Sequence, residues 1–530
     1  MSSFFYTKSL QDLLKHHDGS QLKRTLTALN LVALGVGAII GAGLFVRTAA
    51  ASAEAAGAAV TMSFIVAAVG CAFAGICYAE FAAMIPIAGS AYAYSYVTMG
   101  ELMAWIIGWA LIMEYALGAA TVAIAWSEYL NNLLGGAIPY EWCHSPFESL
   151  KKVVDQSSID QIIASSPDLG HHLKNGELLL SDEGYNNLGS SLQGLVQITH
   201  GFINAPALII LLALTLLLIK GTQESAMVNS IIVFVKVAIV LLFIILGWQF
   251  IKPENHTPFM IPEGTLGHEG FFKHGWGGVL GGAAIVFFAF IGFDAVSTAA
   301  QEAKNPKRDM PIGILGSLII CTILYILFGH VLTGVANWQE FKTAGKEASV
   351  TYAIQNYMKG YEWLGTSVTV AILAGFSSVI LVMLMGQSRV FFSMSKDGLL
   401  PKAFSELHPK FKTPYKANWI LLIFVGAFAA FIPGSVAGDL TSFGTLFAFV
   451  LVCLGIIIMR KKEPDMERPF KTPLVPLVPI LGMVICLAMI ISLPIPTLIS
   501  AGIWLVFGLL VYFGYSANHA RKMRENLTKY

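Results

Sequence analysis

The sequence predicts an all-α membrane protein of about twelve transmembrane helices, and three observations point to this class. Of the 530 residues, 56% are hydrophobic and only 12% are charged, whereas soluble domains carry about 25% charged residues. The mean hydropathy is +0.69. Apolar stretches long enough to cross a bilayer as a helix, which takes about 20 residues, recur along nearly the whole chain. A soluble protein of this length would need far more surface charge.

The apolar windows form two sets of five helices followed by a further pair. The first set lies within 29–251, the second within 279–459, and the last pair within 472–515. Polar tails, 1–28 and 516–530, flank them. The individual spans are predicted at roughly 29–51, 59–84, 102–133, 204–219, 227–251, 279–300, 312–335, 366–390, 417–432, 437–459, 472–493 and 496–515.

Positive charge orients these helices. If the N-terminus lies in the cytoplasm, most of the 33 lysines and arginines fall in cytoplasmic segments, as the positive-inside rule requires. We therefore predict a multi-pass protein of the inner (plasma) membrane, in contact with the lipid bilayer, with both termini cytoplasmic. The net charge of +1 provides no basic surface for nucleic acid. The six cysteines show no CxxC spacing and predict no disulfide framework.

A long external loop is predicted at 134–203. It is rich in serine and acidic residues and has little apolar periodicity. The sequence leaves open whether it is a small ordered cap or a flexible loop. His171 and His172 in this loop lack a convincing set of partner ligands, so we interpret them as solvated histidines rather than as a metal site.

Two of the apolar runs are interrupted. The first carries four glycines between Gly35 and Gly43, and the sixth carries Gly292. Glycine in a helix interior costs about 1 kcal/mol relative to alanine, so the first cluster predicts local unwinding from Gly41 to Gly43. Non-helical backbone at membrane depth is tolerated only where it lines a cavity or is buried in protein. Close helix packing through small residues is the alternative interpretation.

Each interrupted run is the first helix of its set of five. An odd number of helices per half makes the second half enter from the opposite side, so the two sets are interpreted as inverted repeats with a substrate site at the midplane between the broken helices. Free amides at the N-terminus of a half-helix favour a carboxylate, and free carbonyls of the other break can receive an ammonium group. Such a site suits a zwitterion.

Lys236 lies about ten residues inside the fifth apolar run. A charged lysine near the centre of a membrane helix costs about 2.5–3.5 kcal/mol on insertion scales. Because desolvation disfavours the charged form, such a lysine can gain and lose a proton under physiological conditions, as proton coupling requires. The hypothesis is that Lys236 carries the coupling proton. The alternative is a structural ammonium bonded to helix carbonyls.

Two acidic residues also fall within apolar runs. Glu114, in the third run, is interpreted as a counter-charge for Lys236 or as a second protonation site, with a neutral, hydrogen-bonded glutamic acid as the alternative. Asp294 ends the sixth-run break and is expected to cap the second half-helix rather than to contact substrate.

Four segments carry a family resemblance. The chain resembles the amino acid–polyamine–organocation transporter superfamily, in the bacterial branch related to cationic amino acid transporters, over roughly 25–515. The segments are 35–45 (GVGAIIGAGLF), 287–294 (FFAFIGFD), 301–311 (QEAKNPKRDMP) and 387–401 (QSRVFFSMSKDGLLP). The resemblance implies a five-plus-five inverted-repeat, LeuT-like fold with two extra C-terminal helices.

The resemblance also implies a set of site residues. Around the bend at Gly41, the amides of Ala42 and Gly43 would hold a substrate carboxylate. The amino group would be held by carbonyls near Ile40, Phe288, Ala289 and Ile291. Lys236 matches the family's fifth-helix lysine, which replaces a sodium ion of sodium-coupled relatives. Met383 in the eighth run stands where members that carry arginine or lysine tend to have a small polar residue, so neutral, small or apolar substrates are favoured.

The predicted function is secondary active transport, by proton-coupled symport of neutral amino acids. The partners are then an amino acid and a proton, while a small membrane partner is left undetermined. Amino acid or polyamine exchange and uptake of arginine or lysine are the alternatives. No catalytic motif of the HExxH or GxSxG type and no P-loop appears in the predicted spans, so we expect no enzyme, no cofactor and no metal ion.

Overall fold

The computed structural model describes most of the chain. The described residues are 6–7, 26–41, 43–85, 89–166, 173–174, 177–180, 182–220, 225–298, 300, 303–342, 349–411 and 413–527. His171 and His172 lie outside them.

Apolar helices make up most of the described structure. Within it, eight helical stretches are long and apolar enough to cross a membrane, and four shorter apolar helices accompany them. The prediction of a helical membrane protein is thereby supported. The principal helices are α2 (Ala28–Ile39), α3 (Thr48–Ala51), α4 (Val60–Met84), α5 (Ser90–Thr98), α6 (Glu101–Ile112), α7 (Gly118–Leu133), α11 (Ala205–Lys220), α12 (Ser225–Gly247), α13 (Gly275–Val286), α14 (Ala295–Thr298), α15 (Pro306–Val335), α16 (Ser349–Tyr357), α17 (Glu362–Lys396), α18 (Tyr415–Phe431), α19 (Gly434–Lys462), α20 (Leu477–Ile491), α21 (Ile495–Val511) and α22 (Ala517–Leu527).

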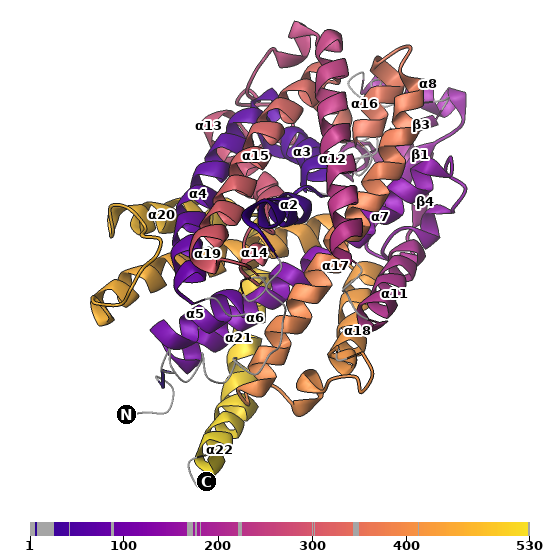
Figure 1. Ribbon diagram of the computed structural model, residues 1–530. Coiled ribbons are helices and arrows are strands. Elements are labelled where there is room, and N and C mark those ends of the chain that lie inside the picture. Colours follow the sequence, from indigo (N-terminus) through magenta and orange to yellow (C-terminus); the bar gives the residue numbers. More distant parts are fainter. Residues whose placement is uncertain are drawn as a thin grey trace.

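Helix α2 lies in the middle of the bundle (Figure 1), where it packs against α15, α12 and α17. Thr27 precedes it as N-cap and accepts a hydrogen bond from the Asn30 N–H. The close packing depends on small residues: a Cβ at Gly35 would lie 2.4 Å from the Ser317 hydroxyl of α15. Gly35 therefore serves close helix packing, which was the alternative interpretation of the glycine cluster. The chain leaves helical geometry further on, at Ile40.

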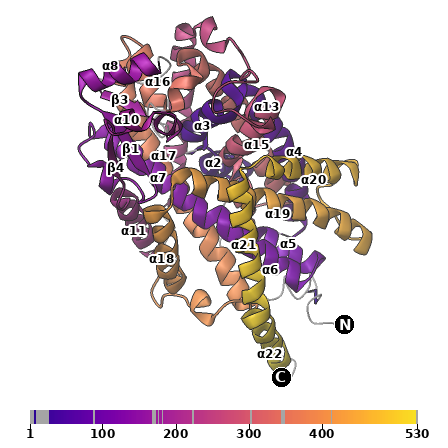
Figure 2. The same cartoon turned by 180° about the vertical axis from the view of Figure 1, so that it is seen from behind.

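Residues near the two chain ends lie together on one face, here called the tail face. The guanidinium of Arg524, in α22, lies 4.5 Å from the ring centroid of Tyr6. Arg524 also forms an ion pair with the buried Glu101 at the start of α6. Figure 2 shows α22 at the end of the molecule opposite the β-strands.

The opposite face, here called the cap face, carries a small folded unit within 134–203. Its strands β1 (Ser149–Val153), β2 (Leu173–Lys174), β3 (Glu177–Leu180) and β4 (Gln197–His200) form an antiparallel sheet in the order β2-β3-β1-β4. Helix α8 (Gln156–Ser165) packs on it, and Val153, Ile159, Ile162 and Leu178 lie in its own apolar core. The described part of this loop is therefore an ordered cap. The strict all-α prediction misses its sheet.

The cap is tied to α7 by a hydrogen-bonded ion pair. His144 Nε2 lies 2.7 Å from a carboxylate oxygen of Glu128, and His144 Nδ1 lies 3.0 Å from the Tyr140 carbonyl oxygen. Burial by itself lowers the pKa of His144, but the hydrogen bond and the charge of Glu128 outweigh it and raise that pKa to about 9. His144 is therefore charged at neutral pH and anchors the cap to the end of α7.

The variant Glu128→Gln is expected to lower the melting temperature at neutral pH. Because the pKa of His144 in the folded protein, about 9, lies above the usual value of about 6.5, the ion pair stabilises fully below pH of about 6.5 and is lost as the pH rises through about 9. The stabilisation is on the order of 3 kcal/mol or less. Melting curves from pH 6 to 10 should show the difference between wild type and Glu128→Gln shrinking. Glu141→Gln, at an exposed side chain, is the control. A pH-independent difference would contradict the assignment.

Candidate functional site

The first break lies where α2 ends. Ile40 leaves helical geometry, with φ −73° and ψ 104°, and Gly41 continues the bend. The chain resumes at Gly43 as a π-helical turn, Gly43–Arg47, which runs into α3. The Gly41 carbonyl accepts hydrogen bonds from the next turn, from Leu44 N at 3.1 Å and from Phe45 N at 3.4 Å. Ala42 lies outside the described residues.

The second break lies at the end of α13. A 3₁₀ turn, Phe287–Phe290, follows α13, and the backbone then turns through Gly292 before α14 begins. Ile291 is extended, with φ −59° and ψ 133°. Gly292 has φ +117°, a conformation that residues with a Cβ rarely adopt. The interruption that the sequence indicates at this glycine is therefore a true break.

The two breaks touch through their backbones. A Cβ at Gly43 would lie 2.1 Å from the Ala289 Cα, and a Cβ at Gly292 would lie 2.9 Å from the carbonyl carbon and oxygen of Ala38. Glycine is thus required at both positions by close approach. The structure brings together, within one buried region, backbone groups that are about 250 residues apart in the chain.

Lys236 reaches the first break from α12. Its ammonium nitrogen donates to the Gly37 carbonyl at 2.8 Å and to the Ile40 carbonyl at 2.9 Å. These carbonyls belong to the last turn of α2, where intrahelical donors are missing. The side chain is only 2% exposed, and Gly375 of α17 leaves room for it, since a Cβ there would lie 3.0 Å from the lysine Cδ and Cε. Lys236 therefore fixes the position of the broken end.

Tyr325 of α15 joins the two breaks. Its hydroxyl oxygen lies 2.9 Å from the Ile39 carbonyl oxygen and 2.8 Å from the Ala289 carbonyl oxygen. The ring packs against Phe64 and Phe290, with centroids 5.4 and 5.3 Å away. One phenol thus contacts a carbonyl from each broken helix.

Glu114 and Asp294 form a pair of buried carboxyl groups. Glu114 lies in a π-helical turn, Met113–Leu117, between α6 and α7, and it faces Asp294 and Thr445. Among the described residues, neither Glu114 carboxyl oxygen has a hydrogen-bond partner. Asp294 accepts from the Tyr115 hydroxyl at 2.6 Å and from the Gly292 N–H at 3.3 Å. Asp294 thus stabilises the turn at Gly292, and Glu114 lies beside Asp294. The partners of the Lys236 ammonium are instead the backbone carbonyls of Gly37 and Ile40.

Met383 lies on the face of α17 that packs against α7. A Cβ at Gly118 would lie 2.8 Å from the Met383 sulfur and 3.4 Å from a Thr441 methyl. About one turn earlier on α17, Val379 packs against Gly41, since a Cβ at Gly41 would lie 3.0 Å from it. Met383 therefore fills space between two helices next to the breaks, as a neutral side chain.

Several contacts hold the cap-face side of the first break. The Phe45 carbonyl accepts from the Ser349 hydroxyl of α16 at 2.8 Å and from the Tyr129 hydroxyl of α7 at 3.3 Å. Arg47, which is buried, forms an ion pair with Asp439 of α19. These buried contacts tie the first break to α7, α16 and α19.

Sequence reasoning identified both breaks, Lys236 and Glu114, and it missed three groups that the structure places beside them. Tyr325 stands alone in an apolar run, where an aromatic residue looks like ordinary packing. Arg47 and its partner Asp439 are 392 residues apart in the chain. No local sequence pattern signals these long-range contacts.

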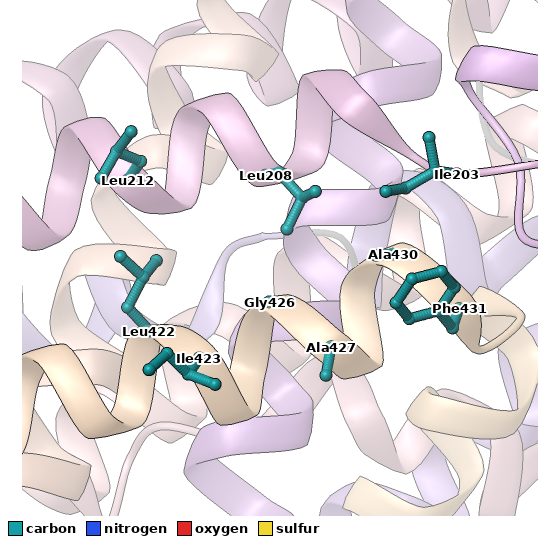
Figure 3. Close-up of a pocket in the computed structure, with 9 residues that line it drawn as sticks. All are labelled: Ile203, Leu208, Leu212, Leu422, Ile423, Gly426, Ala427, Ala430 and Phe431. Atoms are coloured by element: carbon teal, nitrogen blue, oxygen red, sulfur yellow. The ribbon is translucent and has the colours of Figure 1, made fainter.

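An apolar groove lies elsewhere, away from the breaks. Figure 3 shows it between α11 and α18, with a volume of about 400 Å³. All nine lining residues are apolar, from Ile203 and Leu208 to Phe431. None of the predicted site residues lines it, and it has no polar group for an amino or carboxyl group. Nor do the described residues contain any group of three or more His, Cys, Asp or Glu side chains that could hold a metal ion.

Two broken helices meet through their backbones deep inside an apolar bundle, and a buried lysine of a neighbouring helix bonds to the end of one of them; this arrangement suits a membrane transporter. Residues 26–515 match the family model described as "Amino acid permease", and the chain belongs to this family of the amino acid–polyamine–organocation superfamily. The expected family is thereby confirmed. The protein is a multi-pass membrane permease, not an enzyme.

Three curated relatives illustrate the range of the family. The chain is 41% identical to "Branched-chain amino acid permease BcaP" of Bacillus subtilis (strain 168), over 98% of the chain and 99% of that protein. It is 38% identical to "Methylthioribose transporter" of the same organism, with the same coverage. It is 30% identical to "Cationic amino acid transporter 4, vacuolar" of Arabidopsis thaliana, over 86% of the chain and 66% of that protein.

The variant Gly43→Ala is expected to reduce uptake at least tenfold, because its Cβ would overlap the Ala289 backbone and force the two breaks apart. The matched control is Gly502→Ala in α21, where a Cβ would meet nothing within 4 Å and alanine favours the helix by up to about 1 kcal/mol. Radiolabelled amino acid uptake and melting temperature check both variants. Wild-type uptake by Gly43→Ala would show that the contact between the breaks is dispensable.

Proposed function

We propose that this permease is a proton-coupled symporter of neutral, apolar amino acids in the plasma membrane. The observation that carries the proposal is the buried Lys236 ammonium, bonded to the Gly37 and Ile40 carbonyls at the end of α2. The proposed architecture is twelve spanning helices, arranged as a five-plus-five inverted repeat within 29–459 and two further helices within 472–515. Both termini are proposed to be cytoplasmic.

The breaks can bind the two ends of a zwitterion through backbone groups. A new helical segment begins at Gly43, and amides at such a start favour a carboxylate. Carbonyls at Ile40, Phe288, Ala289 and Ile291 are the proposed acceptors for the amino group. Each carbonyl oxygen has two lone pairs, so Ile40 can accept from a substrate while Lys236 stays in place.

Lys236 is proposed to carry the coupling proton. Burial removes water from the ammonium and disfavours its charged form, and no described carboxylate is bonded to it. Hydrogen bonds from a charged donor are roughly twice as strong as neutral ones. A protonated Lys236 therefore holds the end of α2 firmly, and loss of the proton weakens that hold. Protonation thereby favours one arrangement of the broken helix over another.

Glu114 is proposed as a second proton-carrying group. It lies beside Asp294, and two carboxyl groups removed from water are difficult to ionise together. Asp294 has the Tyr115 hydroxyl and the Gly292 N–H to stabilise its charge, whereas Glu114 faces the Asp294 carboxyl group itself and Thr445. The proton is therefore assigned to Glu114. Its release would place two negative charges next to the second break.

Branched-chain amino acids are the proposed substrates. Two relatives named as branched-chain permeases, at 41% and 32% identity, match 99% and 97% of their own lengths, whereas the relatives named as cationic transporters match at most 66% of theirs. Met383 offers no charge to a cationic side chain, and its thioether suits an apolar one.

The proposed orientation places the tail face in the cytoplasm and the cap outside. Tyr6 and Arg524 lie together on the tail face. The segments with many lysines and arginines, around 389–416 and 460–471, are the ones that the positive-inside rule assigns to the same side.

Proteoliposomes without internal substrate test the coupling. With acid outside, wild type is expected to accumulate leucine. Lys236→Ala is expected to accumulate at least tenfold less leucine under the same pH gradient, because no group remains to carry the proton at the break. Lys220→Ala, at the exposed end of α11, is the control. An exchanger would need internal substrate to take up leucine. Full pH-driven uptake by Lys236→Ala would refute the assigned role.

A thermal-shift screen of the twenty amino acids in detergent tests the substrate class. Leucine, isoleucine and valine are expected to raise the melting temperature by a few degrees, because a ligand present at 100 times its Kd stabilises the folded state by about 2.7 kcal/mol. Methylthioribose is an informative additional probe. Stabilisation by arginine and lysine without any by leucine would overturn both the substrate class and the interpretation of Met383.

A further inference from the structure

We infer that Tyr325 is a positioning residue that transmits the protonation state of Lys236 at the first break to the substrate-binding carbonyl of the second break. The inference rests on the proposed function of Lys236. It goes beyond that function because it assigns a route between the proton and the substrate.

The contacts form a continuous chain across the site. Lys236 holds the Gly37 and Ile40 carbonyls, which lie on either side of the Ile39 carbonyl in the sequence. The Ile39 carbonyl lies 2.9 Å from the Tyr325 hydroxyl oxygen, and the Ala289 carbonyl lies 2.8 Å from the same oxygen. The end of α2 and this phenol thus form a hydrogen-bonded link from the lysine to the second break, in addition to the backbone contacts at Gly43 and Gly292.

A tyrosine hydroxyl has a single proton to donate. It can donate fully to Ile39 or to Ala289, but not to both. In the empty site, one of the two carbonyls therefore lacks this donor, and an unsatisfied buried carbonyl is unfavourable. A substrate N–H placed at Ala289 allows the hydroxyl to turn to Ile39, and both carbonyls are then satisfied.

The position of Ile39 decides which way the hydroxyl turns. When Lys236 is charged, it holds the end of α2 in place, the hydroxyl donates to Ile39, and Ala289 is free to accept from the substrate. When Lys236 is neutral, its hold weakens and the Ile39 carbonyl is less well placed. The hydroxyl then donates to Ala289 and competes with the substrate amino group. Proton binding thereby raises substrate affinity, and the reciprocal effect follows by linkage.

Among the described residues, the titratable groups that act on Lys236 and Tyr325 are thiols. The titratable side chain that acts on Lys236 is Cys321, on α15. Cys321 and Cys71, on α4, are the titratable groups that act on Tyr325. From α17, Lys236 meets Gly375, and the Tyr325 ring meets Phe64 and Phe290. A pH effect on substrate binding that requires the Tyr325 hydroxyl therefore points to Lys236, whereas an effect through Glu114 would not require this hydroxyl.

The test is the equilibrium Kd for leucine of detergent-solubilised full-length protein at pH 6 and pH 8. Wild type is expected to bind about tenfold more weakly at pH 8, the equivalent of one hydrogen bond of about 1.4 kcal/mol. Tyr325→Phe keeps the ring between Phe64 and Phe290 but has no proton to donate, so its Kd is expected to change less than twofold between the two pH values.

Tyr512→Phe is the matched control. Its hydroxyl is buried and donates to Glu101 at 3.1 Å, on the tail face and away from the breaks. This variant should keep the wild-type pH effect, and the melting temperatures of both variants verify folding.

Two outcomes would overturn the inference, and they are distinguishable. If Tyr325→Phe binds more weakly at both pH values but keeps the tenfold difference, the hydroxyl has only a structural role and the relay is wrong, while the proposed function stands. If wild type itself binds leucine equally at pH 6 and pH 8, the coupling role of Lys236 fails and the relay fails with it.

Discussion

The structure depends on one constraint: a helix interrupted inside a membrane leaves backbone groups without intrahelical partners, and these groups must find partners within the protein. At the first break, Lys236 donates to the Gly37 and Ile40 carbonyls. The Tyr325 hydroxyl lies within hydrogen-bond distance of the Ile39 carbonyl between them and of the Ala289 carbonyl in the second break. The donors come from α12 and α15, so helices outside the broken pair determine how the breaks are held.

The same constraint explains the packing around the breaks. Gly43 allows the backbone of the first break to approach Ala289, and Gly292 provides a turn that packs against Ala38. Asp294 then accepts from the Gly292 N–H and satisfies one more backbone donor. Few polar groups at the breaks are therefore left unpaired among the described residues. Glu114 is an exception, and this makes it suited to change its protonation.

Much of this site was predictable from composition and spacing. The glycine cluster ending at Gly43 and the single Gly292 identified both breaks, and the depth of Lys236 in its apolar run singled it out as a candidate site residue. The hydrogen-bond partners were not predictable, because Tyr325 resembles any aromatic residue in an apolar helix. Glu114 and Asp294 come from opposite halves of the chain, and only the fold brings them together.

The cap shows where hydrophobic periodicity in the sequence does not predict the secondary structure. Its strands β1, β3 and β4 have five residues or fewer, too short for alternation to stand out from the polar loop around them. Its stability comes from a separate apolar core, with Ile159 and Leu178 fully buried in it, and from the His144–Glu128 contact. An ordered cap of this kind is specified by long-range contacts rather than by local pattern.

An experimental structure with leucine bound tests the central claim most directly. The account predicts the leucine carboxylate at the amides near Gly43 and its amino group at the Ala289 carbonyl, with Lys236 still bonded to Gly37 and Ile40. Leucine bound in another part of the bundle, with the two breaks in contact and unoccupied, would contradict it.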